Sequence, residues 1–267
     1  MTLDLHSTFE EAVEYLLKKN VMPTDMTTAE LRRYSQAFRE QSFYSARTVF
    51  EDVLGVYKSD VDLLLNPKQI KDAARITETN PEGLTEISTD LSSIKYRVRE
   101  LLREHRYTQP EGERGRITDL SSDARIKLIV ETNRDLAWGN GMKRQGNTDV
   151  RIENYPGWML FRLYEKKIPR DWPERFQLAG EKCGEPDGWI VNGGGGMFAL
   201  KNHPIWKELG SSANFDDALD VDYPPFAFNS GMRVEEVSRA DCESQGIIAP
   251  DEYPPAKTES EFKVSNN

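Results

Sequence analysis

The spacing of apolar residues changes near Val150, and this change limits the folds that the chain can adopt. Before Val150, apolar residues recur every three or four positions, which places them on one face of an α-helix. After it, short apolar runs alternate with turn residues, as in β-strands. We therefore expect an α+β protein. Its N-terminal half should be mainly helical, and its mixed α+β C-terminal half should contain a small antiparallel sheet.

Capping signals predict where two helices of the first half begin. Ser7 to Glu10 (STFE) and Thr27 to Glu30 (TTAE) each fit a capping box, in which a hydroxyl caps the first turn and the glutamate reaches back. The first box predicts a helix that Asn20 and Pro23 end. The second predicts a long helix to about Tyr57 that is apolar on two faces. Such a helix is usually buried between others, with an oligomer surface as the alternative.

Further elements follow along the chain. We expect a short helix at 70–76, a loop at 77–83, an amphipathic helix at 94–105, and a helix that residues 119–123 cap and that Gly139 and Gly141 stop. In the second half we expect strands at 158–164, 189–191, 197–200 and 234–237, short helices at 174–178, 204–209 and 239–245, and an extended segment, fixed by prolines, at 223–228. The glycines of 192–196 should close a hairpin between the second and third strands.

The loop at 108–115 (TQPEGERG) is the best candidate for an internal boundary. It separates a helical region, 1–108, from an α+β region, 116–249. The polar, proline-bearing stretch 250–267 carries little apolar surface with which to offset the entropy of ordering, so we expect a disordered tail.

All five tryptophans lie after residue 137, which predicts a compact aromatic core in the C-terminal half. They are Trp138, Trp158, Trp172, Trp189 and Trp206. Tyr223, Phe226 and Phe228 should join them, with Trp158 or Trp206 as the partner of the two phenylalanine rings.

Charge argues against tight nucleic-acid binding. The net charge is −10, and 211–267 holds twelve acidic against four basic residues, a net of −8. Acidic surfaces repel phosphate backbones. The basic stripe from Lys95 to Arg106 leaves a DNA-binding module open. However, it alternates with Glu100 and Glu104, which favours a solvated face with ion pairs four residues apart. No strong nucleic-acid binding is expected.

Motifs for cofactors and metals are missing from the sequence. The glycine run at 193–196 lacks the Lys and Ser/Thr of a phosphate-binding loop. The three histidines are far apart, and no spacing suits zinc. A nucleophile pair of Cys183 and His203 has no local support. With two cysteines and no run near 18 apolar residues, we expect a reducing compartment and no membrane-spanning helix. We expect no cofactor, no metal and no catalytic residue.

Four segments resemble one protein family. They are 120–141 (LSSDARIKLIVETNRDLAWGNG), 167–172 (KIPRDW), 197–206 (MFALKNHPIW) and 222–232 (DYPPFAFNSGM). Together they are similar to phage minor head proteins of the Mu F-like head morphogenesis family, in particular to prophage-type members. The similarity spans roughly 8 to 247. Many members carry a Cys-Arg-Cys where this chain has 229–232 (NSGM), so no role of those cysteines carries over.

The resemblance implies a structural role in building the phage head. It implies a position near the portal, with the portal protein as partner and scaffold or coat protein as further candidates. The protein would occupy the host cytoplasm during assembly and then the virion head. The alternative from another class is a toxin-like enzyme of phage origin, a nuclease or an ADP-ribosyltransferase.

The proline segment is the candidate site, as a packed structural clasp or an interaction surface. Its residues are Trp206, Tyr223, Pro224, Pro225, Phe226, Phe228, Asn229, Gly231 and Met232. In an extended chain Phe226 and Phe228 share one face, and Gly231 would permit a turn.

Overall fold

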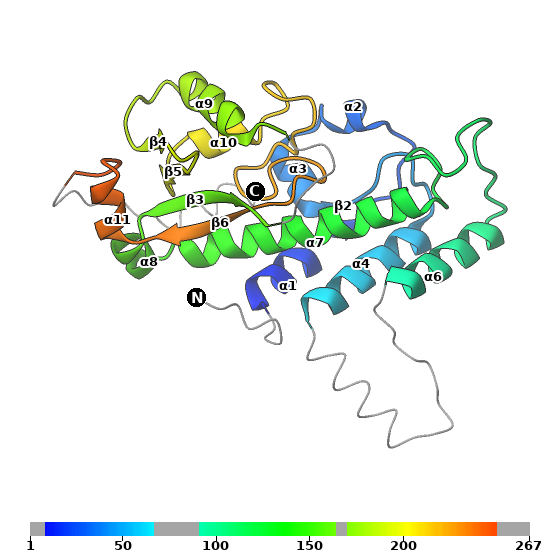
Figure 1. Ribbon diagram of the computed structural model, residues 1–267. Coiled ribbons are helices and arrows are strands. Elements are labelled where there is room, and N and C mark those ends of the chain that lie inside the picture. The colour runs from blue at the N-terminus through cyan, green and yellow to red at the C-terminus, as the bar shows by residue number, and fades with distance from the viewer. Residues whose placement is uncertain (1–8, 67–90, 164–169, 250–267) are drawn as a thin grey trace, which may run out of the picture. The chain divides into compact units, whose positions relative to one another are not determined.

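The computed structural model describes residues 9–66, 91–163 and 170–249 (Figure 1). The chain forms two compact units, Met1–Gly141 and Met142–Asn267, and each is treated by itself below. The helices and the four-stranded antiparallel sheet confirm the expected α+β class. The predicted loop at 108–115 connects two helices inside the first unit. The predictions for 70–76, 77–83 and 250–267 lie outside the described residues.

The first unit is a layer of helices with one short parallel strand pair (Figure 1). Its elements are α1 (Glu10–Leu17), β1 (Asn20–Val21), α2 (Thr28–Leu31), α3 (Gln36–Gln41), β2 (Ser42–Phe43), α4 (Glu51–Leu65), α6 (Leu91–Glu104) and most of α7 (Asp123–Gly146). Apolar side chains of α1, α4, α6 and α7 form one core, with Leu54, Tyr57 and Ile94 among its buried members. The apolar faces predicted for the helices near 9–17, 94–105 and 126–137 are confirmed, because most of their residues meet in this core.

The first predicted capping box is only partly tested. Helix α1 begins at Glu10 with Phe9 as its N-cap, and no side chain caps it. Ser7, the expected cap, lies outside the described residues. At the other end, the Lys58 ammonium donates to the carbonyls of Leu17 and Lys19, at 3.2 and 2.6 Å. A cation at a helix C-terminus satisfies carbonyls that have no partner within the helix.

The predicted long helix from Thr27 to Tyr57 is wrong, although its capping box is correct. The Thr27 hydroxyl accepts from the Glu30 amide at 3.3 Å, and the Thr27 amide donates to the Glu30 carboxylate at 2.7 Å. The helix then ends after one turn, and Ser35 caps α3 separately. Beyond α3 the chain extends and pairs with β1. These tertiary pairings outweigh helical periodicity, which is only a weak local preference.

Helix α7 continues past both glycines that were expected to stop it, and it ends at Gly146. A Cβ added to Gly141 would lie 2.9 Å from the Ala12 amide nitrogen and 3.0 Å from the Phe9 ring. Glycine at this position therefore permits α1 to approach the α7 backbone closely. The N-terminus of α7 is capped as expected, because the Ser122 hydroxyl accepts from the Arg125 amide at 3.1 Å.

Lys19 binds the C-terminal end of α3 through its side chain. The ammonium group is buried and donates to the carbonyls of Glu40, Arg39 and Ser42, at 2.7, 3.4 and 3.5 Å. It also lies 4.4 Å from the centre of the Tyr15 ring. Burial lowers the pKa of Lys19 to about 7, against an opposing effect of the Glu40 carboxylate.

The second unit packs helices against a sheet with the strand order β4-β5-β3-β6. Its elements are α8 (Asp149–Asn154), β3 (Gly157–Arg162), α9 (Trp172–Cys183), β4 (Trp189–Val191), β5 (Met197–Leu200), α10 (Ile205–Leu209), β6 (Met232–Val237) and α11 (Arg239–Ser244). Strands β4 and β5 form the predicted hairpin, and β3 pairs with both β5 and β6. Helix α9 is longer than expected, because Asp171 caps it and Gly184 ends it only after Cys183.

Gly141→Ala is expected to lower the stability of the first unit. The added methyl group would meet the backbone of α1, which cannot move without disturbing the core. Gly55 is the matched control, since it also lies inside a helix but a Cβ there would meet nothing within 4 Å. Gly55→Ala should therefore stabilise by up to about 1 kcal/mol. Urea unfolding of both variants checks the pair, and a stabilised Gly141→Ala variant would contradict the close approach.

Lys19 should make stability depend on pH above neutrality. Its pKa is about 7 in the folded protein and near the ordinary 10.5 when unfolded, so between these values the unfolded chain binds one more proton. Stability should then rise by about 1 kcal/mol per pH unit from pH 7 to pH 9. Urea melts of Lys19→Met should lack this rise. Lys18→Met, at an exposed neighbour, should retain it, and equal slopes in the two variants would refute the assignment.

Candidate functional site

Trp206 is the centre of the candidate site. Its buried ring stacks on Phe226 with the ring centres 5.8 Å apart, and it meets Trp158 and Phe176 edge-on, each at 5.6 Å. The indole N–H donates to the Leu200 carbonyl at 2.8 Å. Four segments of the second unit therefore converge on one side chain. The expectation that Trp206 or Trp158 is the partner of Phe226 is confirmed for Trp206.

The other tryptophans divide between the two cores. Trp158 and Trp172 are buried in the same cluster as Trp206, and Trp189 packs at its edge. Trp138 does not belong to it, because its ring packs against Phe9 in the first unit, with centres 5.7 Å apart. The predicted C-terminal aromatic core thus holds for four of the five tryptophans.

The expected extended conformation of 223–228 is wrong. The Phe226 amide donates to the Tyr223 carbonyl at 3.2 Å, and the Ala227 amide donates to the Pro225 carbonyl at 2.7 Å, so the chain turns twice. The Pro224–Pro225 peptide bond is cis, and Phe226 has a φ of 59°. A bulky residue rarely adopts positive φ, and burial of its ring against Trp206 is the compensating interaction here.

The turned segment separates the two phenylalanines that an extended chain would have placed on one face. Phe226 is fully buried, whereas Phe228 is only partly buried. Asn229 is exposed with a φ of 50°, a conformation that asparagine tolerates better than most residues. Gly231 adopts the left-handed conformation at φ 69°, as its predicted role in a turn requires. Tyr223, Pro224, Pro225 and Met232 are buried.

Polar contacts hold the segment to its neighbours. The Phe228 amide donates to the Asp217 carbonyl at 3.0 Å, and the Leu219 amide donates to the Phe226 carbonyl at 2.9 Å. The Ser230 hydroxyl donates to the Pro225 carbonyl at 2.6 Å. These bonds close the loop on itself and on 217–219. We call 222–232, together with Trp206, the clasp.

One carboxylate joins the clasp to α9. Asp217 accepts from Arg170 at 2.5 Å and from Arg175 at 2.6 Å. Arg170 also donates to the Phe228 carbonyl at 2.8 Å, and Arg175 lies over the Phe215 ring, 4.0 Å from its centre. Sequence reasoning missed this ion-pair group, because Asp217 lies 42 or more residues from both arginines and no local motif marks it.

A second buried cation lies between α7 and the sheet in the same unit. The Lys201 side chain is 0% exposed and donates to Glu236 at 2.7 Å and to the Gly146 carbonyl at 2.8 Å. Arg151 holds the other oxygen of Glu236 at 2.8 Å. Burial lowers the pKa of Lys201, and the adjacent Glu236 carboxylate opposes that effect. The group therefore links the last turn of α7, α8, the β5 end and β6.

His203 and Cys183 do not form a nucleophile pair. The Ile205 amide donates to Nδ1 of His203 at 3.1 Å, so Nε2 carries the proton that it shares with the Asp187 carbonyl at 2.9 Å. Burial lowers the pKa of His203, which favours this neutral form. The Cys183 thiol donates to the Gly180 carbonyl at 3.0 Å. Both cysteines are free thiols.

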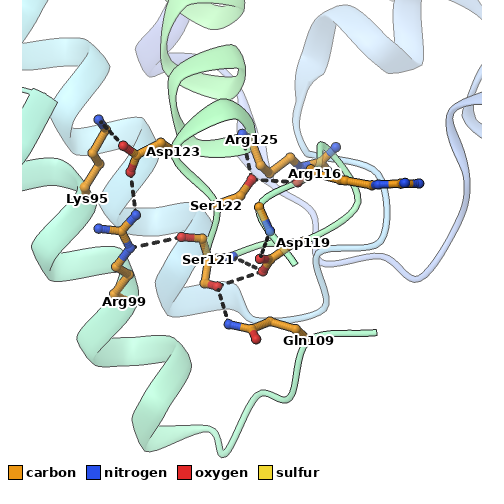
Figure 2. Close-up of polar contacts among 10 residues, drawn as sticks. Lys95, Arg99, Gln109, Arg116, Asp119, Ser121, Ser122, Asp123 and Arg125 are labelled. Carbon is orange, nitrogen blue, oxygen red and sulfur yellow. Dashed lines mark hydrogen bonds and ion pairs between the residues drawn. The ribbon is translucent and has the colours of Figure 1, made fainter. Parts of the chain in front are cut away.

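The predicted basic stripe lies on α6 in the first unit, and its cations are paired mainly with other elements. Figure 2 shows Lys95 and Arg99 meeting at the Asp123 carboxylate, beside the start of α7. Arg97 pairs with Asp60 of α4. Arg103 alone pairs within the helix, with Glu100 at 2.6 Å. The interpretation as pairs spaced along the helix is therefore corrected, since most of the stripe joins α6 to its neighbours.

The same region holds the polar junction that precedes α7 (Figure 2). Asp119 accepts from the Ser121 amide at 2.9 Å, from the Ser121 hydroxyl at 2.7 Å and from the Gly115 amide at 2.9 Å. Gln109 donates to the Ser121 hydroxyl at 3.1 Å. These contacts close the 108–122 connection on itself, and Arg99 of α6 joins it by donating to the Ser121 carbonyl at 3.0 Å.

Comparisons with protein-family models, with curated proteins and with solved structures find no match for this chain. Among the residues that the structure describes, no helix is long and apolar enough to cross a membrane. Within the same ranges, no three His, Cys, Asp or Glu side chains gather as a metal site would require.

Phe226→Ala should destabilise the second unit by about 3–5 kcal/mol, because it removes a fully buried ring from the contact with Trp206. Phe228→Ala is the matched control two residues away, and its partly exposed ring should cost much less. Urea melts followed by tryptophan fluorescence separate the two. Equal losses of stability would contradict the turned clasp.

Proposed function

We propose that this protein is a structural minor head protein of a phage, acting in head morphogenesis near the portal. Its partner is the portal protein, with scaffold or coat protein as further contacts. The observation that supports the proposal is the placement of the resembling segments. Trp172, residues of 197–206 and residues of 222–232 all contribute to one buried cluster in the second unit. Three of the four resembling segments therefore contribute to one packed core, and apolar residues of the fourth, 120–141, belong to the core of the first unit.

The chemistry of the same segments favours assembly over catalysis. The side chains that they bring together are apolar, and the histidine among them has both ring nitrogens bonded to backbone groups. A toxin-like enzyme would need a nucleophile or a general base that faces a substrate. The buried Lys201 ammonium instead bonds to the Glu236 carboxylate and to the Gly146 carbonyl of α7.

The test is a deletion of the gene in the phage or prophage that carries it. Without the protein, heads should fail to assemble or to fill, which electron microscopy and infectious titre measure. Wild-type protein supplied in trans should restore both. A Val150→Ser variant, altered at a highly exposed position, is the control for expression and should restore them equally.

Two outcomes would contradict the proposal. Normal heads and normal titre in the deletion strain would exclude a role in head morphogenesis. Failure to find the protein by mass spectrometry in purified procapsids that contain the portal would exclude the proposed position. In either case, damage to host nucleic acid or modification of a host protein on expression would favour the enzyme alternative.

A further inference from the structure

Two exposed aromatic rings lie close to the start of α3, one in the connection that follows α2 and one in α3 itself. Tyr34 and Phe38 stack with their centres 4.8 Å apart and their planes inclined by 25°. They are 40% and 38% exposed. A stacked pair of large rings that remains partly in water retains apolar area that a partner could bury.

Helix α3 differs from the other helices of its length or longer in the described part of the first unit, because it has no buried residue. None of its apolar side chains belongs to the buried core of the first unit. What holds it is polar: the Ser35 cap at one end, and the Lys19 ammonium bonded to the last carbonyls at the other. A helix positioned in this way presents its outer face without depending on that face for stability.

Charge identifies the kind of partner. Residues 27–48 contain four arginines and two glutamates, whereas the whole chain has a net charge of −10. Arg33 and Arg47 are exposed, and each interacts electrostatically with the Glu30 carboxylate. The Glu30 carboxylate is already bonded to Thr27, at 2.7 Å. The segment thus combines an excess of arginines with an exposed aromatic pair. Guanidinium groups bind carboxylates through paired hydrogen bonds.

We propose that Arg33, Tyr34, Phe38 and Arg47 form a docking surface, the α2–α3 surface, for an acidic segment of a partner protein that carries large apolar side chains. Carboxylates of the segment pair with the arginines, and its apolar side chain covers the two rings. The surface belongs to the first unit and uses none of the residues on which the proposed function rests.

An acidic peptide fits these observations better than a nucleic acid. The two rings stack on each other, so their inner faces are closed to bases, whereas binding of single strands relies on rings that bases can cover. A long polyanion would also meet the repulsion of a chain with net charge −10. A short peptide with a few carboxylates is repelled much less.

The experiment measures fluorescence anisotropy of a labelled peptide with full-length protein at about 150 mM salt. The probe is a twelve-residue synthetic peptide of Glu and Asp around one Trp and one Leu. A second probe replaces every Glu and Asp by Gln and Asn, and a third is a labelled single strand of twenty thymidines. The acidic peptide should bind, and the neutral peptide should bind at least tenfold more weakly.

Two double variants locate the binding. Tyr34→Ser with Phe38→Ser removes the rings, and Arg33→Glu with Arg47→Glu reverses the charges. Each should weaken binding of the acidic peptide at least tenfold. Since the four side chains are exposed, melting temperatures should stay close to wild type. Tyr96→Ser, at an aromatic residue of α6 that is also exposed, is the control and should leave the affinity unchanged.

Three results would overturn the proposal: no binding of the acidic peptide, equal binding of the neutral peptide, or binding that both double variants leave intact. Tighter binding of the thymidine strand than of the acidic peptide, lost in the same variants, would replace the peptide by nucleic acid. None of these results depends on whether the protein assembles phage heads.

Discussion

The packing around Trp206 is the interaction on which the second unit depends. A single indole contacts an aromatic ring from β3, another from α9 and a third from the clasp, and its N–H satisfies a carbonyl at the end of β5. These segments are spread over 69 positions from Trp158 to Phe226 and share no local signal. Close packing of their rings removes a large apolar area from water, and edge-on and stacked contacts add to it. The same packing offsets the cost of the positive φ at Phe226, whose ring stacks on Trp206.

Ion pairs complete the fold in a repeated way. In the described part of the chain, three carboxylates each bond to two cations that are distant from them in sequence: Asp123 to Lys95 and Arg99, Asp217 to Arg170 and Arg175, and Glu236 to Lys201 and Arg151. A buried or half-buried charge is tolerated only when it is paired and its remaining hydrogen-bonding groups are satisfied. Lys201 meets this condition with Glu236 and a backbone carbonyl. Many of the charged residues therefore do not simply face solvent, because they form ion pairs that connect one helix, strand or loop to another.

Local signals predicted much of the secondary structure, and the failures share one cause. The hairpin between β4 and β5 was readable because its turn glycines and apolar flanks are contiguous. The helix from Thr27 to Tyr57 was wrong because periodicity does not report the strand pairing of Ser42 and Phe43 with β1. The helix stop predicted at Gly141 is wrong, because the glycine there permits the close approach of α1, a contact with Ala12 that lies 129 positions away in the sequence. In each failure a long-range contact overrode a local preference.

For the candidate site, composition and order identified the residues, whereas the tertiary structure decided their roles. Sequence alone determined the fold class, the aromatic richness of the second half and the membership of Trp206 and Phe226 in one core. It could not distinguish the burial of Phe226 from that of Phe228, because the same sequence is compatible with an extended segment and with a turned one. Nor could it reveal Asp217 between two arginines, or the stacked, exposed rings of Tyr34 and Phe38 at a helix that has no buried residue. Apolar periodicity is a property of neighbours in the chain, but burial, ion pairing and exposure depend on which distant segments meet, and that is settled only when the whole core packs.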